Sequence, residues 1–481
     1  MSLRGRSLIT IGDFSNEEIE AVLDAAAEME ADLRGQAHRL PGALLASLFF
    51  EPSTRTRLSF EAAMLRLGGR VVSATDVEAS SIAKGESLAD TARVVSRFTD
   101  LIVLRHPWEG SARLMAERSD VPVLNAGDGA HEHPTQTLLD LYTLRKEKGR
   151  LGGLNVALCG DLKNGRTIHS LAYALARFGS NILSMPAEGL GLPDYVIDKL
   201  RRAYGCKPEV AHLSRISKPS EIHTTLAGAD VVVLTPHRPH QLSLFTQVEE
   251  SLPEIVTHID ALYVTRAQKE RFESPAPEEE TPARGSAGGP DVKGKGAGPA
   301  YPVVDRAFLR RQEFRKAVVM HPLPRVDELA YEMDEDPRSR YFEQAARGVP
   351  VRMALIALIL GAFPGPRARR AETPPPAETG RTCKSRIGVR CPNERCVSRQ
   401  EARYVTPEFR VVETRPPRLK CVYCERDVRP AYAGNPKSRR YYPADRTARG
   451  KEAMDWVFFA SRGEAEESGF QPAREGKARR P

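Results

Sequence analysis

The chain has 481 residues, enough for roughly two to four domains with sizeable hydrophobic cores. Hydrophobic residues make up 41% and charged residues 28%, a composition that is typical of globular proteins and argues against a wholly disordered chain. The net charge of +8 would suit nucleic acid, but many arginines stand in the low-complexity C-terminal third, which weakens that interpretation.

The predicted elements of the first part alternate between helix and strand. Asn16–Ala31 has apolar residues at helical spacing. The short apolar run Ala43–Phe50 predicts a buried strand, and Leu101–Arg105 predicts another. Thr135–Lys146 again has a helical pattern. This alternation favours parallel strands joined by helices, with a first domain at residues 1–140.

A second domain is predicted at residues 141–363, with its repeating strand and helix pattern beginning near Gly152. It repeats the alternation, so we expect an α/β fold with two doubly wound parallel-sheet domains. The expected strands are Asn155–Cys159, Asn181–Ser184, Val231–Leu234 and Ala317–Met320, and the expected helices are Thr167–Phe178 and a closing helix at Val351–Phe363.

Two segments have compositions that cannot bury much apolar surface. Residues 274–299 are rich in Pro, Glu, Gly, Ala and Lys and predict a disordered insert. Residues 364–380 predict a proline-rich linker. The longest apolar run, Met353–Phe363, is too short to cross a bilayer, and the first residues lack the apolar core of a signal peptide. We therefore expect a cytoplasmic protein.

The strongest local motif is FFEPSTRTRLSF at residues 49–60. A buried strand ends there and Ser53, Thr54, Arg55 and Thr56 open a helix. Free backbone N–H groups, hydroxyls and a guanidinium converge at such a position, which is suited to a phosphate group. The alternative is a simple Ser/Thr helix cap.

The full string resembles the carbamoyl-phosphate motif of the aspartate/ornithine carbamoyltransferase family. Further family motifs follow in order over roughly residues 5–363: ASSIAKGESLADT with Ser80 and Lys84, LRHPWEG with Arg105, HEHPTQTLLDLYTL with His133 and Gln136, GDLKNGRTIHSL with Arg166, YVTRAQKER with Arg266 and Gln268, and MHPLPRVDEL with Pro322 and Leu323.

The resemblance implies that residues 1–140 bind carbamoyl phosphate and residues 141–363 bind the amino-acid substrate. Arginines offer bidentate contacts to phosphate oxygens, and donors aimed at the carbonyl oxygen stabilise the charge that develops there. The residues that carry these roles by resemblance are Arg55, Thr56, Lys84, Arg105 and His133 as catalytic groups, with Ser53, Thr54, Ser80 and Gln136 as substrate-binding groups. The Ser80–Lys84 segment resembles a loop that reaches a neighbouring subunit's site, so a trimer or a multiple of trimers is expected.

The amino-acid half favours the aspartate branch. Aspartate has two carboxylates, which suit two arginines, here Arg166 and Arg266, assisted by Gln268. The carbonyls of Pro322 and Leu323 are expected to orient the substrates. Ornithine enzymes usually carry H-C-L-P where this chain has H-P-L-P. The implied reaction forms N-carbamoyl-L-aspartate and phosphate, the committed step of de novo pyrimidine (UMP) biosynthesis.

The implied transfer needs no nucleophilic residue and no organic cofactor. Positioning and electrostatics suffice, and the departing phosphate is able to accept the amine proton. The segment from Gly152 to Asp161 superficially resembles a dinucleotide-binding turn but lacks GxGxxG. NAD is therefore not expected.

The C-terminal part contains a cysteine pattern. Cys391, Cys396, Cys421 and Cys424 form two close pairs, a spacing that favours one tetrahedral structural zinc over disulfides. CPNERC and LKCVYC resemble the zinc domain of the aspartate carbamoyltransferase regulatory chain, predicting a small β-rich zinc domain at residues 381–430. The family's nucleotide-binding domain has no counterpart ahead of it. We hypothesise that this fused domain stabilises the catalytic trimer or joins trimers.

Residues 431–481 leave two interpretations open. They resemble a small Ada-type zinc module whose ligand positions read Tyr442, Asp445 and Ala473, so that its metal would be lost, or they form a basic disordered tail. For the whole chain, the alternatives to the aspartate enzyme are the ornithine enzyme, a non-catalytic scaffold and a nucleic-acid-binding protein. The last would bind with steep salt dependence; neither nucleic acid nor a membrane is expected as a partner.

Overall fold

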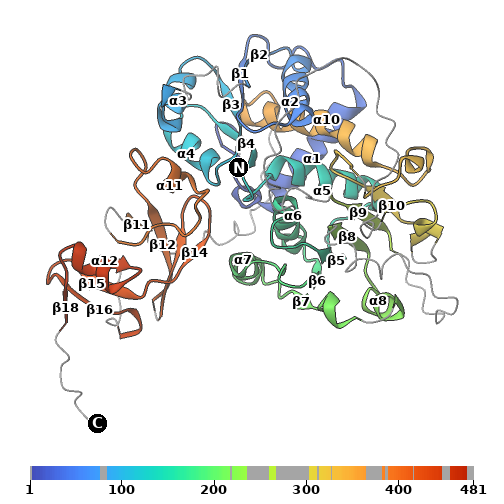
Figure 1. Ribbon diagram of the computed structural model, residues 1–481. Coiled ribbons are helices and arrows are strands. Elements are labelled where there is room, and N and C mark those ends of the chain that lie inside the picture. The colour runs from blue at the N-terminus through green and yellow to red at the C-terminus, as the bar shows by residue number, and fades with distance from the viewer. Residues whose placement is uncertain are drawn as a thin grey trace, which may run out of the picture. The chain divides into compact units, whose positions relative to one another are not determined.

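The computed structural model describes residues 3–75, 84–216, 219–235, 259–266, 303–310, 314–326, 328–363, 382–384, 388–414, 416–446 and 456–473 (Figure 1). The predicted insert at 274–299 and the linker at 364–380 lie outside these residues. Two compact units share the chain. The first comprises residues 1–139, 202–204 and 348–481, and the second comprises residues 140–201 and 205–347.

The first unit contains a four-stranded parallel sheet in the order β2-β1-β3-β4. Each crossover between strands is a helix, as a parallel sheet requires. Helix α2 packs on β1 and β2, and α4 packs on β3 and β4 (Figure 1). The elements are α1 (Asn16–Ala31), β1 (Leu44–Phe49), α2 (Thr54–Arg66), β2 (Arg70–Ala74), α3 (Leu88–Val95), β3 (Leu101–His106), α4 (Ser111–Arg118), β4 (Val123–Asp128) and α5 (Pro134–Lys148).

Helix α1 shows how closely local sequence sets an element. Ser15 is the N-cap, and its hydroxyl accepts the Glu18 N–H while the Glu18 carboxylate accepts the Ser15 N–H at 2.8 Å. This reciprocal capping satisfies donors that a helix leaves unpaired at its start. The apolar face that begins at Ile19 is buried. The predicted bounds, Asn16–Ala31, are confirmed.

The second unit contains a six-stranded parallel sheet in the order β10-β9-β8-β5-β6-β7. Its central strands are buried along their whole length, which explains why they appear in the sequence as continuous apolar runs. The elements are β5 (Asn155–Gly160), α6 (Arg166–Arg177), β6 (Asn181–Pro186), α7 (Asp194–Tyr204), β7 (Glu209–Val210), α8 (Pro219–Thr225), β8 (Val231–Thr235), β9 (Ala261–Val264) and β10 (Val318–Met320).

The closing helix is longer than predicted. Helix α10 spans Tyr341–Ile359 and contains Pro350, whereas the sequence predicted a helix over Val351–Phe363. A proline removes one backbone hydrogen bond and ordinarily marks a helix start, so it concealed the first part of α10. Residues 351–359 are nearly all fully buried, and this burial offsets the lost bond.

The C-terminal part contains two small sheets. The first has the order β11-β12-β13-β14 and is antiparallel, and the second has the order β17-β15-β16-β18 with α12 beside it. Their elements are β11 (Thr382–Lys384), α11 (Val397–Gln400), β12 (Glu408–Thr414), β13 (Pro417–Cys421), β14 (Asp427–Val428), β15 (Tyr432–Asn435), β16 (Arg440–Pro443), β17 (Val457–Phe459), α12 (Arg462–Glu467) and β18 (Gln471–Pro472).

The predicted fold class is confirmed: two parallel-sheet α/β domains are followed by β-rich C-terminal structure. Among the described residues, no helix combines the length and apolarity needed to span a membrane.

Candidate active site and metal centre

The predicted phosphate motif lies between β1 and α2. Ser53 is the N-cap of α2, yet its side chain makes no capping hydrogen bond, so the simple-cap alternative does not account for this hydroxyl. Arg55 is exposed in the first turn of α2, and Thr56 is half-buried behind it. Partial burial lowers the pKa of Arg55 below its ordinary value, but a guanidinium remains charged at neutral pH. The helix start thus offers an arginine and unpaired N–H groups together.

Arg105 reaches the same end of the sheet from the neighbouring strand. It pairs in register with Phe49 of β1 and is buried. One Nη donates to the Ala126 carbonyl at 3.1 Å, and the other lies 3.1 Å from Glu51 Oε2. Glu51 belongs to the phosphate motif and stands two residues ahead of Ser53. The ion pair therefore fixes the guanidinium of Arg105 beside the segment that carries Arg55.

His133 follows β4, the next strand of the sheet, and immediately precedes α5. It is buried, and its Nδ1 lies 3.5 Å from the Thr135 hydroxyl. Its carbonyl accepts the N–H of Gln136 at 3.0 Å, and the Gln136 side chain is also buried. The phosphate motif and His133 follow the carboxyl ends of β1 and β4, and Arg105 lies at the carboxyl end of β3 between them. Ligands of open α/β sheets bind at this edge.

Lys84 is the first described residue of the segment that leads into α3. It is exposed, and Gly85 with φ +92° separates it from the start of α3. Among the described residues it forms no ion pair. Ser80 lies outside the described residues.

The predicted amino-acid site belongs to the second unit. Arg166 is the first residue of α6, after a turn in which Asp161 Oδ1 accepts the N–H groups of Lys163 and Asn164 at 3.1 Å each. Arg266 follows β9, and both arginines are half-buried. These positions again follow the carboxyl ends of parallel strands. Gln268 lies outside the described residues.

Pro322 and Leu323 follow β10 in a turn shaped by a buried histidine. Leu323 has φ +53°. The Leu323 N–H donates to His321 Nδ1 at 2.8 Å, and His321 Nε2 donates to Glu328 Oε1 at 2.9 Å. Both side chains of this pair are fully buried. His321 and Glu328 were not among the site residues predicted from the sequence, although a histidine between a strand and a proline is a usable signal.

The four predicted metal ligands converge. Cys391, Cys396, Cys421 and Cys424 are all buried and free of disulfides. The Sγ atoms of Cys391 and Cys424 are 3.3 Å apart, and those of Cys396 and Cys421 are 3.8 Å apart. Thiolates around a tetrahedral ion at about 2.3 Å lie about 3.8 Å from one another, so the donor set fits one ion. Hydrogen bonds from Cys391 and Cys421 lower the pKa of Cys396, which favours its thiolate.

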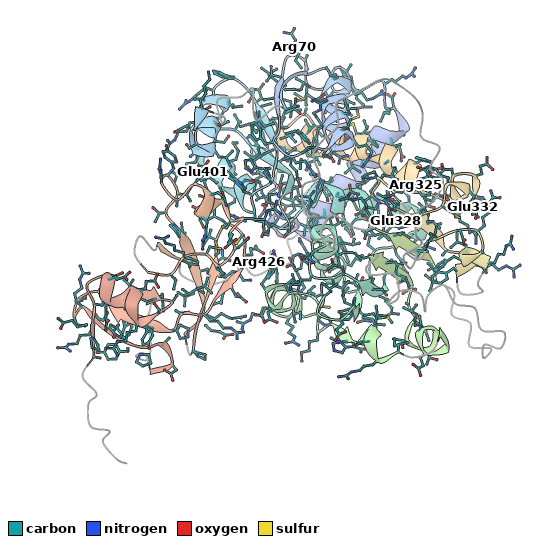
Figure 2. All side chains as sticks on the ribbon, viewed as in Figure 1. Arg70, Arg325, Glu328, Glu332, Glu401 and Arg426 are labelled. Carbon is teal, nitrogen blue, oxygen red and sulfur yellow. The ribbon has the colours of Figure 1, made fainter. Side chains whose placement is uncertain are left out.

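The metal module, here residues 388–428, packs on the first sheet's domain within the same unit. Backbone hydrogen bonds join Glu109 to Arg395 at 3.0 Å and Val397 to Glu109 at 2.9 Å. Glu401, labelled in Figure 2, accepts the Leu88 N–H at the start of α3 at 2.6 Å. Apolar side chains of both parts form one core cluster. The module is therefore an integral part of this unit.

Comparison with known proteins gives consistent matches. The family described as "Aspartate/ornithine carbamoyltransferase, carbamoyl-P binding domain" matches residues 6–146, its "Asp/Orn binding domain" matches residues 152–359, and "Aspartate carbamoyltransferase regulatory chain, metal binding domain" matches residues 385–431. The aspartate carbamoyltransferase catalytic subunit of Methanopyrus kandleri is 48% identical over 361 residues, covering 75% of this chain and 99% of that protein.

Two solved structures are similar to this chain. The catalytic subunit of M. jannaschii aspartate transcarbamoylase is 40% identical, with a TM-score of 0.55 over 74% of this chain and 98% of that one. The Trypanosoma cruzi aspartate transcarbamoylase in complex with carbamoyl phosphate and aspartate is 33% identical, with a TM-score of 0.54 over 74% and 97%.

Proposed function

Because the chain belongs to the aspartate/ornithine carbamoyltransferase family, we propose that it transfers the carbamoyl group of carbamoyl phosphate to the amine of L-aspartate. The products are N-carbamoyl-L-aspartate and phosphate, and the reaction commits carbon to pyrimidine synthesis in the cytoplasm. The observation that carries this proposal is the placement of Arg55, Arg105 and His133 at or just after the carboxyl ends of adjacent strands.

Carbamoyl phosphate is assigned to the first unit. Its phosphate dianion is bound by Arg55, Arg105 and the hydroxyl and N–H groups of Ser53 and Thr54. Bidentate guanidinium contacts make such binding specific for tetrahedral oxyanions. Thr56, Arg105 and His133 donate to the carbonyl oxygen, where negative charge develops as the amine attacks. Each well-placed donor contributes about 3–4 kcal/mol to lowering the barrier. Gln136 binds the carbamoyl amide.

Aspartate is assigned to the second unit. Arg166 and Arg266, with Gln268, bind the two carboxylates, and the carbonyls of Pro322 and Leu323 accept hydrogen bonds from substrate N–H groups. The amine attacks the carbonyl carbon, the bond to phosphate breaks, and the leaving phosphate takes the amine proton. Positioning of the two substrates accounts for most of the rate enhancement.

Zinc is the ion that best fits the four thiolates, and its role is structural, since no position remains open for substrate. We also propose a trimer or a multiple of trimers, in which Ser80 and Lys84 serve a neighbouring subunit's site. The exposure of Lys84 supports this assignment.

The decisive experiment measures product formation from carbamoyl phosphate with L-aspartate or L-ornithine, for the wild type and Arg55→Ala. We expect aspartate-dependent product and a fall of about 10²–10³-fold in the variant. Turnover of ornithine alone would move the chain to the sister branch. Inactivity with both substrates in a folded, metal-loaded sample would favour the scaffold alternative.

A further inference from the structure

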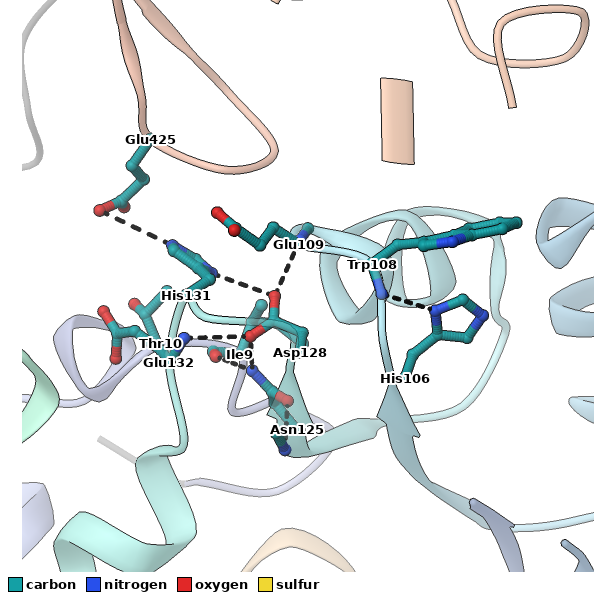
Figure 3. Close-up of polar contacts among 12 residues, drawn as sticks. Ile9, Thr10, His106, Trp108, Glu109, Asn125, Asp128, His131, Glu132 and Glu425 are labelled. Atoms are coloured by element: carbon teal, nitrogen blue, oxygen red, sulfur yellow. Dashed lines mark hydrogen bonds and ion pairs between the residues drawn. The ribbon is translucent and has the colours of Figure 1, made fainter. Parts of the chain in front are cut away.

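A second group of potential metal ligands lies where the metal module meets the loop between β4 and α5 (Figure 3). His131 is at its centre, with a side chain only 2% exposed. His131 Nδ1 lies 3.0 Å from Asp128 Oδ2, and that carboxylate also accepts the Gly110 N–H at 2.9 Å. An imidazole that donates one N–H to a buried carboxylate presents its other nitrogen as a lone-pair donor, which is the usual arrangement around metal-bound histidine.

The other ring nitrogen lacks a hydrogen-bond partner. His131 Nε2 is buried and lies 4.0 Å from Glu425 Oε2, a separation too long for a hydrogen bond. The carboxylate of Glu132, whose Oε2 also accepts the Ile11 N–H at 2.9 Å, completes the group, and the donor atoms of the three residues lie within 4.8 Å of one another. Ligands at about 2.0–2.2 Å from a tetrahedral ion are separated by about 3.3–3.6 Å, so small side-chain rotations would close the set.

Several buried carboxylates surround His131, so a cation bound there would be stabilised. Glu109 has a buried carboxylate oxygen, Oε2, without a hydrogen-bond partner, and Arg426 Nε lies 3.7 Å from it. Buried carboxylates in excess of cations are costly unless a positive charge compensates them.

We propose that His131, Glu132 and Glu425 form a second metal site, for a divalent transition-metal ion such as zinc, with Asp128 orienting the imidazole. Its nitrogen-and-oxygen donor set differs from that of the four cysteines. Glu425 belongs to the metal module, whereas His131 precedes His133 by two residues in the loop after β4. The ion would therefore tie the module to the segment that carries a proposed catalytic histidine.

Equilibrium dialysis of the full chain against zinc, followed by metal quantification, tests the site. We expect about one equivalent beyond that held by the four thiolates, with the extra equivalent lost in His131→Asn and retained in His38→Asn, an exposed histidine that serves as control. Binding of a single equivalent by the wild type would overturn the proposal, as would retention of the extra equivalent in His131→Asn.

A second measurement does not depend on the variants folding. Cobalt(II) added to wild type that holds a single zinc equivalent at the four thiolates should give a weak visible band without the intense thiolate charge-transfer absorption, because the second site offers nitrogen and oxygen donors. The proposal would be overturned if no such band appeared and nitrogen NMR spectra showed both ring nitrogens of His131 protonated. A proton would then occupy the place of the ion. Glu425→Gln should weaken the cobalt band.

Discussion

Arg105 Nη2 lies 3.1 Å from Glu51 Oε2, joining the ends of two neighbouring parallel strands by one ion pair. Its other Nη is held by the Ala126 carbonyl. The guanidinium is thus fixed from two sides before any substrate binds. Such preorganisation matters because reorienting a charged group during the reaction would cost free energy.

Arg105→Lys tests this fixed geometry. A lysine keeps the charge but cannot bind Glu51 and Ala126 while also binding phosphate in a bidentate manner. We expect kcat/KM to fall about 10²–10³-fold with little loss of stability. Arg97→Lys is the control, since Arg97 is 75% exposed and pairs with Asp120 on the surface. Equal activities of the two variants would contradict the role given to Arg105.

Gly110→Ala tests the docking of the metal module. Gly110 has φ +82°, and a Cβ there would lie 2.6 Å from Tyr423 Cβ. We expect a loss of more than about 1–2 kcal/mol in the free energy of unfolding, because backbone strain and the clash add. Gly42→Ala is a matched control with φ +84° and open space around the new Cβ. Chemical denaturation of both variants separates the clash from the strain, and equal losses would argue against tight docking.

Metal removal should release the module. Structural zinc supplies much of the folding free energy of small cysteine-bound domains, so Cys421→Ser or chelation should unfold the module and lower the melting temperature. Cys206→Ser, which alters a cysteine outside the cluster, should leave the module folded and the melting temperature unchanged. Calorimetry measures stability, and sedimentation shows whether the proposed trimer survives. If chelation changed neither the assembly nor the melting temperature, the proposed stabilising role of the metal module would be contradicted.

The His321–Glu328 pair makes the second unit sensitive to acid. Burial opposes ionisation of Glu328, but the hydrogen bond from His321 prevails and leaves its pKa below 4.5. A carboxylate with a depressed folded-state pKa stabilises the protein above the unfolded pKa, and this contribution is lost as the pH falls through the folded value. Glu328→Ala should cost about 3–5 kcal/mol near neutral pH, because His321 loses its buried partner.

The same variant also changes the pH profile. Denaturation experiments between neutral pH and the acid transition measure the free energy of unfolding of Glu328→Ala and Glu328→Gln. Below about pH 4.5 this free energy should decline less steeply in the variants than in the wild type. Glutamine can still accept a hydrogen bond from His321 Nε2, so Glu328→Gln should lose less stability at neutral pH than Glu328→Ala. An acid limb identical to that of the wild type would contradict the assignment.

Much of the fold could be predicted because its strands are buried and continuous. β1, β3, β5 and β8 appeared as apolar runs, and the structure places them near the centres of the two sheets. Strands β2 and β7 were missed because they are short or exposed edge strands. The buried strands β4 and β9 were also missed, because β4 (VLNAGD) contains polar residues and glycine and β9 has only four residues. The start of α10 was missed because Pro350 imitates a helix boundary.

The site residues could be predicted from motifs, whereas the contacts that hold them in place could not be predicted from the sequence. Nothing local in the sequence pairs Glu51 with Arg105 or brings Glu425 to His131, since these partners meet only through the register of β1 and β3 and the docking of the metal module. Sequence spacing indicates which residues meet substrate, whereas tertiary packing decides what holds them there.

The covalent attachment of the metal module has a further consequence. Docking through Glu109 and Glu401 is an intramolecular event, so its effective concentration is set by the chain and not by protein abundance. A module on a separate polypeptide would dissociate on dilution, whereas here the ratio of module to catalytic domain stays fixed at every concentration. The stability gained from docking should accordingly be independent of dilution.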